Sequence, residues 1–193
     1  LMTAPAQPLT SVLRVSNLSK AYNGVLALDG VDLDVRPGEV HALLGENGAG
    51  KSTLIKIMSG VYQPDTGTIE LDGKPATFAS PQAAQDSGIA TIYQELLLFP
   101  ELSVAENNFM GHAPKNRLGA IDWGKMRERA RELLASLDIH DLDVTAIVGA
   151  LSVGNRQRIE IAKALSHNAR VLIMDEPTAA LTEHDVERLF GIV

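Results

Sequence analysis

The segment Gly45-Glu-Asn-Gly-Ala-Gly-Lys51-Ser52 constrains the fold more than any other part of the sequence. It fits the pattern of a glycine, four residues, then glycine-lysine-serine, in which the glycines let backbone N–H groups turn toward phosphate oxygens. Lys51 would place a cation on the terminal phosphates, and Ser52 offers a hydroxyl ligand for Mg²⁺. The glycine spacing does not fit the dinucleotide fingerprint. The segment therefore predicts a loop that binds nucleotide phosphates.

The flanking residues support this interpretation. The run Glu39–Leu44 is short and rich in apolar residues, which predicts a buried strand leading into the loop. After the loop, Leu54, Ile55 and Met58 recur at helical spacing, and Gly60 is a typical helix stop. A strand, a phosphate loop and a helix in this order point the helix N-terminus at the anion.

The composition excludes several classes of protein. With 193 residues and 45% hydrophobic content, the chain is long enough to bury one sizeable core. Its net charge of −7 and the lack of a long Lys/Arg block disfavour nucleic acid as a ligand. There is no cysteine, and no apolar run approaches the ~20 residues of a membrane helix. We expect a soluble, cytoplasmic α/β domain.

The order of the other patterns suggests how the chain is organised. Residues 1–11 are rich in Pro, Ser, Thr and Gln, and we expect a disordered tail there. An antiparallel β region is predicted next, with a hairpin turn at Asp72-Gly73. The predicted strands cover Leu13–Val15, Leu28–Val35, Thr68–Leu71 and Ile89–Tyr93.

The region from about 101 to 169 has helical character. Ser103-Val-Ala-Glu106 is a capping box that opens a helix. Met126, Ala130 and Leu134 belong to one apolar stripe of a second helix, and the charged residues 127–132 around it are expected to face solvent. The predicted fold is thus an α/β phosphate-loop core with an antiparallel β subdomain and an inserted α-helical subdomain.

Two adjacent carboxylates follow a predicted buried strand, Arg170–Met174. In phosphate-loop proteins that hydrolyse nucleotides, an acidic residue at a strand end holds Mg²⁺, and Asp175 occupies such a place. Glu176 is our candidate general base for an attacking water. The alternative is that these carboxylates only cap the following turn.

Three further residues are weak signals when taken singly. Gln94 follows the predicted strand Ile89–Tyr93 and offers an amide to Mg²⁺ or to the attacking water. Tyr22 offers an aromatic face for stacking on adenine, although a half-buried core tyrosine is the more common case. Ser152 precedes a predicted helix, Asn155–Leu165, where it either helps to bind an anion or merely caps the helix.

Together these motifs resemble the ATP-binding subunits of ABC transporters. Tyr22, Gly45–Ser52, Gln94, Leu151–Asn155 and Met174–Glu176 occur in the order and approximate spacing of that family, from Leu13 onward. Finer features are similar to the branch that imports ribose, galactose, xylose and related sugars, in which two ATPase domains usually stand in tandem. These features are Tyr93–Leu96, Glu160–Leu165 and Glu176–Thr182, and the chain resembles the first of the two domains.

The resemblance implies a role for each matching residue. Tyr22 would stack on adenine, and Asp175 would bind Mg²⁺ together with Ser52 and Gln94. Glu176 would act as base, with Gln94 and Lys51 completing the catalytic set. Ser152 and Gly154 would contact the γ-phosphate of ATP held by a second ATPase domain. The residues that would hold the phosphates are Gly45, Asn47, Gly48, Gly50, Lys51, Ser52 and Thr53.

The chain departs from the family pattern at several positions. Val153 and Asn155 stand where glycine and glutamine are usual, and Thr182 stands where aspartate is common. The switch histidine of the family is expected beyond Val193, together with the last core strands, and His184 is too close to Glu176 to take its place. The domain would therefore cover 12–193 in C-terminally truncated form, with impaired activity. The other histidines, His41, His112, His140 and His167, are expected to be structural or surface residues.

The leading hypothesis is an ATPase, with ATP and Mg²⁺ as cofactors, that powers sugar import at the cytoplasmic face of the bacterial inner membrane. Its expected partners are a second ATPase domain, a transmembrane permease and, indirectly, a sugar-binding protein, but not nucleic acid. The apolar run Leu96–Phe99 is either a docking surface for the permease or part of the core. The alternatives are import of a nucleoside or another small solute, a soluble ABC ATPase without transport, and a nucleotide-binding module that hydrolyses little.

Overall fold

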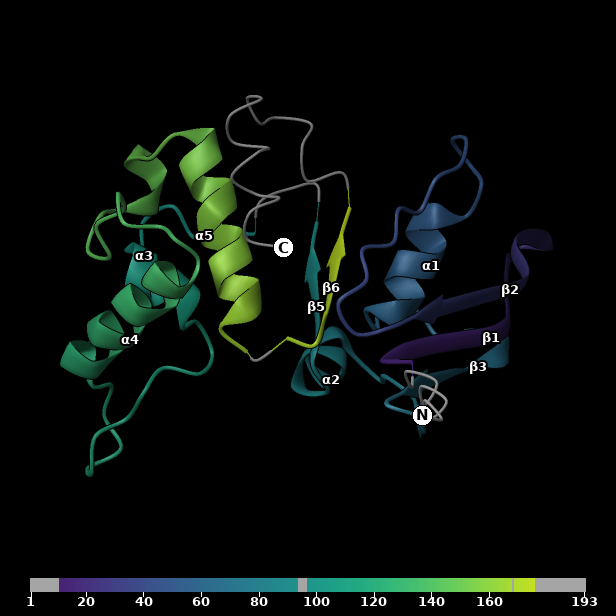
Figure 1. Cartoon of the computed structure of the whole chain (residues 1–193), viewed down its shortest axis with the longest axis horizontal. Coiled ribbons are helices and arrows are strands. Elements are labelled where there is room, and N and C mark those ends of the chain that lie inside the picture. Colours follow the sequence, from purple (N-terminus) through teal and green to yellow (C-terminus); the bar gives the residue numbers. More distant parts are fainter. Residues whose placement is uncertain (1–10, 94–96, 168, 176–193) are drawn as a thin grey trace, which may run out of the picture. The chain divides into compact units, whose positions relative to one another are not determined.

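A computed structural model describes residues 11–93, 97–167 and 169–175 of the chain (Figure 1). It divides into two units, Leu1–Ile89 and Ala90–Val193, and each unit is described by itself. Within the described residues, no helix is both long enough and apolar enough to span a bilayer. The predicted tail, residues 1–11, lies outside the described residues except for Ser11.

The first unit contains a four-stranded antiparallel sheet with the strand order β2-β1-β3-β4. The side chains of Leu13, Val15 and Leu18 in the central strand β1 are buried, and they form the apolar centre of the sheet. This confirms the predicted antiparallel β region, although the strands are longer than the sequence indicates. The strands are β1 (Leu13–Tyr22), β2 (Val25–Val35), β3 (Thr66–Leu71) and β4 (Lys74–Ala76).

The β3–β4 turn confirms the hairpin predicted at Asp72-Gly73. Both residues adopt positive φ angles, 53° and 71°, which is the geometry of a type I′ turn. Leu71 and Lys74 face each other directly across the two strands. The same geometry recurs at Asn23 and Gly24, between β1 and β2, where φ is 48° and 82°.

Helix α1 (Lys51–Met58) follows the glycine-rich loop, as predicted. Leu54, Ile55, Ile57 and Met58 are buried, and Gly60 adopts a φ of 75° just after the helix end. A second helix, α2 (Pro81–Asp86), is capped by the side chain of Ser80, which accepts a hydrogen bond from Ala83 N at 3.2 Å. Figure 1 shows α1 beside the sheet of this unit.

The prediction of a buried strand at Glu39–Leu44 was wrong. This segment has no regular secondary structure, and Val40 and Leu44 are 76% and 87% exposed. A β-strand exists through hydrogen bonds to a neighbouring strand. Among the described residues, the sheets are β2-β1-β3-β4 and β5-β6, and neither includes this segment. Apolar character alone therefore does not make it a strand.

In its described residues, the second unit combines a two-stranded sheet with three α-helices and a short 3₁₀ helix. Met126, Ala130 and Leu134 pack in an apolar cluster of this unit, whereas Arg127, Glu128, Arg129, Arg131 and Glu132 are exposed, as predicted. The elements are β5 (Ile89–Ile92), α3 (Val104–Asn108), α4 (Trp123–Ser136), η1 (Val148–Ala150), α5 (Val153–Leu165) and β6 (Val171–Met174).

The capping box predicted at the start of α3 is present. Ser103 Oγ accepts a hydrogen bond from Glu106 N, and the Glu106 carboxylate accepts one from Ser103 N at 2.9 Å. Hydrogen bonds from Ser103 hold the pKa of Glu106 below its ordinary value. The first N–H groups of the helix thus find partners locally.

One buried amide connects α3 with the segment before it. Asn107 is fully buried, and its Oδ1 accepts a hydrogen bond from Phe99 N at 2.8 Å. Its Nδ2 donates to Phe99 O at 3.0 Å and to Ser103 O at 3.1 Å. The neighbouring Asn108 is equally buried, but its amide has no hydrogen-bond partner among the described residues.

We predict that Asn107→Ala lowers the free energy of unfolding by roughly 1–3 kcal/mol, because it removes a fully buried, hydrogen-bonded amide and leaves Phe99 N without its acceptor. Asn108→Ala is the matched control, since it removes an equally buried amide that has no such hydrogen bonds, and it should cost clearly less. The measurement is the urea midpoint of each variant at an unchanged slope. Equal losses in the two variants would contradict this role of Asn107.

Candidate nucleotide-binding site

The glycine-rich loop ends where α1 begins, and the helix start leaves backbone donors open. The first hydrogen bond of the helix runs from Leu54 N to Gly50 O at 2.9 Å. The N–H groups of Lys51, Ser52 and Thr53 therefore have no acceptor within the helix. Together with the positive end of the helix dipole, they form a cradle for phosphate oxygens.

Lys51 is held over this loop. Its Nζ donates hydrogen bonds to Gly45 O at 2.5 Å and to Glu46 O at 3.0 Å. Both acceptors are backbone carbonyls, so the ammonium group has no carboxylate partner among the described residues. The positive charge therefore remains available to an anion in the loop.

Gly50 allows the loop to lie against strand β2. It adopts a φ of 87°, and a Cβ at this position would lie 2.5 Å from Ala27 O and 2.7 Å from Leu28 Cδ2. A side chain at this residue would thus require the helix start to move. Gly48 also has a positive φ, 85°, but nothing lies within 4 Å of the position that a Cβ would take. At Gly48, therefore, only the backbone angle favours glycine, and not a lack of space.

Tyr22, the predicted adenine platform, ends strand β1 in the same unit. Tyr22 is 36% exposed, and its ring forms a T-shaped pair with that of Tyr62, with a centroid separation of 5.6 Å and an interplanar angle of 65°. Lys20 Nζ lies 5.7 Å from the centre of the Tyr22 ring. A ring face is the surface that stacks on a base, and Lys20 lies over the Tyr22 ring. The sequence did not point to Tyr62, because its contact with Tyr22 is made only in the fold.

Ser152, the candidate in the second unit, caps helix α5. Its Oγ accepts a hydrogen bond from Asn155 N at 3.3 Å, which confirms the capping interpretation. Ser152 is also exposed, as is the following Val153. The hydroxyl can therefore still donate a hydrogen bond outward while its oxygen caps the helix.

The side chain of Asn155 is turned toward its own helix. Its Oδ1 accepts a hydrogen bond from an Arg158 N–H at 3.0 Å. The same guanidinium forms a two-pronged pair with the Asp141 carboxylate, at 2.9 and 2.5 Å, and Arg158 is only 6% exposed. Bidentate pairs of this kind fix geometry as well as charge. The sequence carried no signal for Asp141, which is seventeen positions away from Arg158.

Asp175 lies directly after β6. Its N–H donates to Ile92 O in the neighbouring strand β5 at 2.9 Å, so the structure places it beside the end of that strand. Gln94 and Glu176 lie outside the described residues. Among the described residues, no group of three or more histidine and acidic side chains is arranged to hold a metal ion.

The apolar run after Gln94 divides between core and surface. Leu98 packs against the apolar cluster of the second unit, whereas Leu97 and Phe99 are 52% and 49% exposed. Lys163 Nζ in α5 donates a hydrogen bond to Leu97 O at 2.6 Å. The core interpretation thus holds for Leu98, whereas permease docking by Leu97 and Phe99 stays a prediction, and Leu96 lies outside the described residues.

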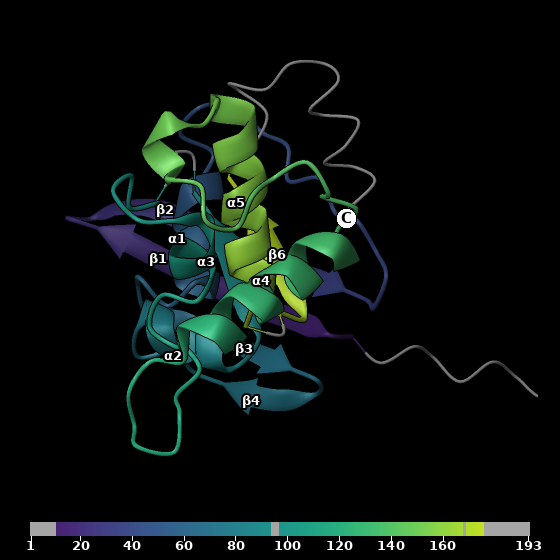
Figure 2. The same ribbon diagram turned by 90° about the vertical axis from the view of Figure 1, so that its left-hand side faces the viewer.

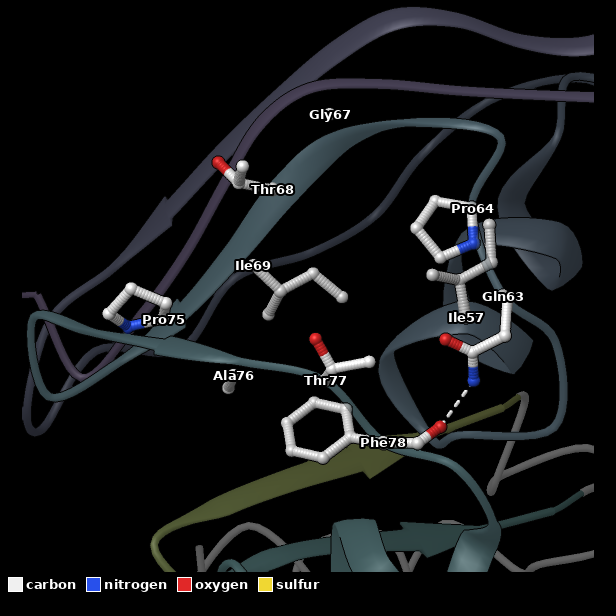
Figure 3. A pocket seen from close by; sticks show the side chains of 10 residues that line it. All are labelled: Ile57, Gln63, Pro64, Gly67, Thr68, Ile69, Pro75, Ala76, Thr77 and Phe78. Atoms are coloured by element: carbon white, nitrogen blue, oxygen red, sulfur yellow. Dashed lines mark hydrogen bonds between the residues drawn. The ribbon is translucent and has the colours of Figure 1, made fainter.

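A separate cavity of about 280 Å³ lies in the first unit, between the end of α1 and the β3–β4 hairpin (Figure 3). Ile57, Ile69 and Phe78 line it, and the Gln63 amide donates a hydrogen bond to Phe78 O at its edge. None of the predicted site residues lines this cavity.

The geometry defines a class of protein. A glycine-rich loop, a lysine over its carbonyls and a helix N-terminus with open donors identify a nucleotide-binding protein of the phosphate-loop type. Residues 28–179 match the family described as ABC transporter. The chain belongs to the ABC transporter family.

Curated relatives of the chain are named as sugar-import proteins. A ribose import ATP-binding protein, RbsA 2 of Rubrobacter xylanophilus, is 55% identical over 98% of this chain and 37% of its own length. A putative ribose/galactose/methyl galactoside import ATP-binding protein of Pseudomonas fluorescens is 54% identical over 98% of this chain and 36% of its own length. The chain thus spans little more than a third of the length of these relatives.

Solved structures show the same fold. The ADP conformation of MJ1267, an ATP-binding cassette of an ABC transporter, has a TM-score of 0.81 at 29% identity, covering 94% of this chain and 74% of that one. The ATP-binding cassette MJ0796, dimeric and bound to ADP and Pi, has a TM-score of 0.76 at 26% identity, covering 93% and 80%. The predicted fold class, an ABC-type ATPase, is confirmed.

We predict that Gly50→Ala lowers nucleotide affinity at least about tenfold and also destabilises the chain, because the added Cβ collides with the Ala27 carbonyl. Gly73→Ala is the control: φ is 71° there, but nothing lies within 4 Å of the added atom. It should show only the strain of a left-handed residue, about 1–2 kcal/mol, with nucleotide affinity unchanged. Titration with a fluorescent ATP analogue and urea unfolding give the two readouts. Retained affinity in Gly50→Ala would refute the contact.

A second prediction concerns Glu160 in α5, whose pKa is raised by burial and partly lowered again by Lys163. Because the folded-state pKa lies above the ordinary value, the native state holds this proton more tightly, and stability falls as pH rises through that window. Glu160→Gln should therefore be the more stable protein at neutral pH, and its advantage should vanish below about pH 4. Urea unfolding across pH measures this, with the exposed Glu128→Gln as control. An advantage independent of pH would contradict the prediction.

Proposed function

We propose that this chain is the ATP-binding and ATP-hydrolysing part of a protein that powers sugar import through a membrane permease. The observation that carries the proposal is the cradle at the start of α1, where Lys51 and three open N–H groups meet in one loop. The names of the relatives, which specify ribose and galactose import, support the substrate class. The protein would act at the cytoplasmic face of the membrane as a peripheral subunit.

The first unit would bind ATP. Its phosphates would lie in the loop formed by Gly45, Asn47, Gly48 and Gly50, against the N–H groups of residues 51–53 and the Lys51 ammonium. The exposed Ser52 hydroxyl stands in the first turn of α1 and would bind Mg²⁺. Tyr22 would stack on the adenine through its aromatic ring.

The second unit would supply the groups for hydrolysis. Asp175 would contribute to Mg²⁺ binding with Gln94, and Glu176 would take a proton from the attacking water. Bound Mg²⁺ neutralises charge that develops on the phosphate oxygens. The protein groups mainly position and stabilise, because phosphoryl transfer needs little covalent chemistry from the protein.

A second ATPase domain would complete the site. Ser152 and Gly154 stand at the exposed N-terminus of α5 and would contact the γ-phosphate of ATP bound by that domain. The dimeric state of the similar cassette MJ0796 supports this arrangement. We further propose that the second domain stands in tandem on the same polypeptide, since the relatives are almost three times as long as their match to this chain. The exposed apolar side chains of Leu97 and Phe99 would contact the permease.

We predict that Glu176→Gln in the intact protein abolishes ATP turnover while ATP stays bound, because the amide cannot accept the proton. Lys51→Ala should instead lose ATP binding itself, by about tenfold or more, because the cation in the loop is removed. Phosphate release and retention of radiolabelled ATP separate the two effects. Turnover that survives Glu176→Gln would refute the base assignment, and binding that survives Lys51→Ala would refute the phosphate cradle.

A further inference from the structure

A projecting hairpin between α3 and α4 exposes apolar side chains. Figures 1 and 2 both show this segment extending away from the helices of its own unit. Leu118 at its tip is 93% exposed, and Ile121 and Trp123 are 41% and 48% exposed. Such a cluster is unusual on a surface without a partner, because the free energy falls when each of these side chains is transferred out of water.

The hairpin is held in this form by its own hydrogen bonds. The Asn116 Oδ1 accepts from Leu118 N at 2.9 Å and from Ala120 N at 3.1 Å. The Asn116 N–H donates to Ala120 O at 2.8 Å, and Asp122 N donates to Pro114 O at 2.8 Å. These hydrogen bonds hold the hairpin in a conformation in which the Leu118 side chain is exposed to solvent.

Basic side chains surround the apolar ones. Lys115 lies directly opposite Ile121 across the hairpin, so the two side chains share one face. Arg117 is next to Leu118, and Arg127 is one helical turn after Trp123 on the same face of α4. All three basic residues are exposed, and none forms an ion pair with another described residue. The only acidic residue from 114 to 127 is Asp122.

We propose that this hairpin, residues 114–123 with the first turn of α4, binds the surface of an anionic lipid membrane. An aliphatic tip, a tryptophan and flanking Lys and Arg are the side chains that settle at the boundary between headgroups and acyl chains. The tip is convex, and a fluid bilayer accepts it without a matching groove. A nucleic acid backbone would attract the basic residues but gain nothing from Leu118.

The net negative charge of the chain favours contact with the membrane through this hairpin rather than through other surfaces. With a net charge of −7, most of the surface is repelled by anionic lipid, and only a local basic patch attracts it. The contact would thus orient the second unit on the membrane. It involves none of the residues assigned to nucleotide binding, so it goes beyond the proposed ATPase function.

Trp123 provides a direct test, because it is the only tryptophan of the chain. Its fluorescence is measured with vesicles of phosphatidylcholine alone and with vesicles that contain equal parts of phosphatidylcholine and phosphatidylglycerol. We expect a blue shift and quenching by brominated lipid with the anionic vesicles only, and reversal by added salt. No shift with anionic vesicles, or an equal shift with both, would overturn the proposal.

Substitutions then separate the two parts of the contact. Leu118→Ser should weaken vesicle binding at least about tenfold, because several buried methylene groups are lost. Arg117→Gln should weaken it about fivefold and reduce its salt dependence. The controls are Val25→Thr, an exposed apolar residue of β2, and Lys74→Gln, an exposed basic residue of β4. Binding should not change in either control.

Three further outcomes are decisive. ATP binding should be unchanged in Leu118→Ser, so a loss of vesicle binding with ATP binding intact supports the membrane contact independently of the nucleotide site. If vesicle binding is the same in Leu118→Ser, Arg117→Gln and the wild type, the proposal is wrong. If vesicles are not bound but Leu118→Ser abolishes co-purification with a detergent-solubilised permease, the hairpin binds protein instead of lipid, and the proposal is also wrong.

Discussion

The close approach of Gly50 to the backbone of β2 is the constraint on which the nucleotide site depends. The absence of a Cβ lets α1 begin within contact distance of Ala27 O, and the left-handed φ of 87° turns the chain sharply into the helix. The open N–H groups of the first turn and the Lys51 ammonium are thereby placed in one loop. Burial of Leu54, Ile55, Ile57 and Met58 then anchors the helix behind them. The phosphate-binding geometry of the loop thus depends on the packing of Gly50 against strand β2 as well as on the sequence of the loop.

In the second unit, polar contacts hold the N-terminal part of helix α5 in place. Ser152 caps α5, while the buried Arg158 ties the same helix to Asp141 and to Asn155. A buried guanidinium is tolerated because its charge is paired and hydrogen-bonded on both prongs. The side chain of Asn155, where the family usually has glutamine, is therefore committed within its own helix. In the proposed contact with a second domain, Ser152 and the backbone near Gly154 carry the recognition.

Sequence reasoning succeeded where the signal is local. The turn at Asp72-Gly73, the capping box at Ser103 and the apolar stripe of α4 each follow from residues within a few positions of one another. Glu39–Leu44 failed, because a strand requires a partner and the sequence does not say which segment pairs with it. Tyr62 and Asp141 were missed for the same reason, since each meets its partner only through the fold. The roles of Gln94 and Glu176 remain predictions from the motifs.

The loop at Gly50 and the hairpin at Leu118 share a physical logic. Each presents groups that a protein normally satisfies or buries, open backbone donors in one case and an aliphatic tip in the other. In both, a local device prevents the chain from relaxing: a glycine that only fits without a side chain, and an Asn116 amide that ties the hairpin tip to itself. Groups that are already ordered before binding lose less conformational entropy when a ligand binds, which favours tight association. Exposure that is fixed by local contacts is therefore the common physical basis of both proposed binding surfaces.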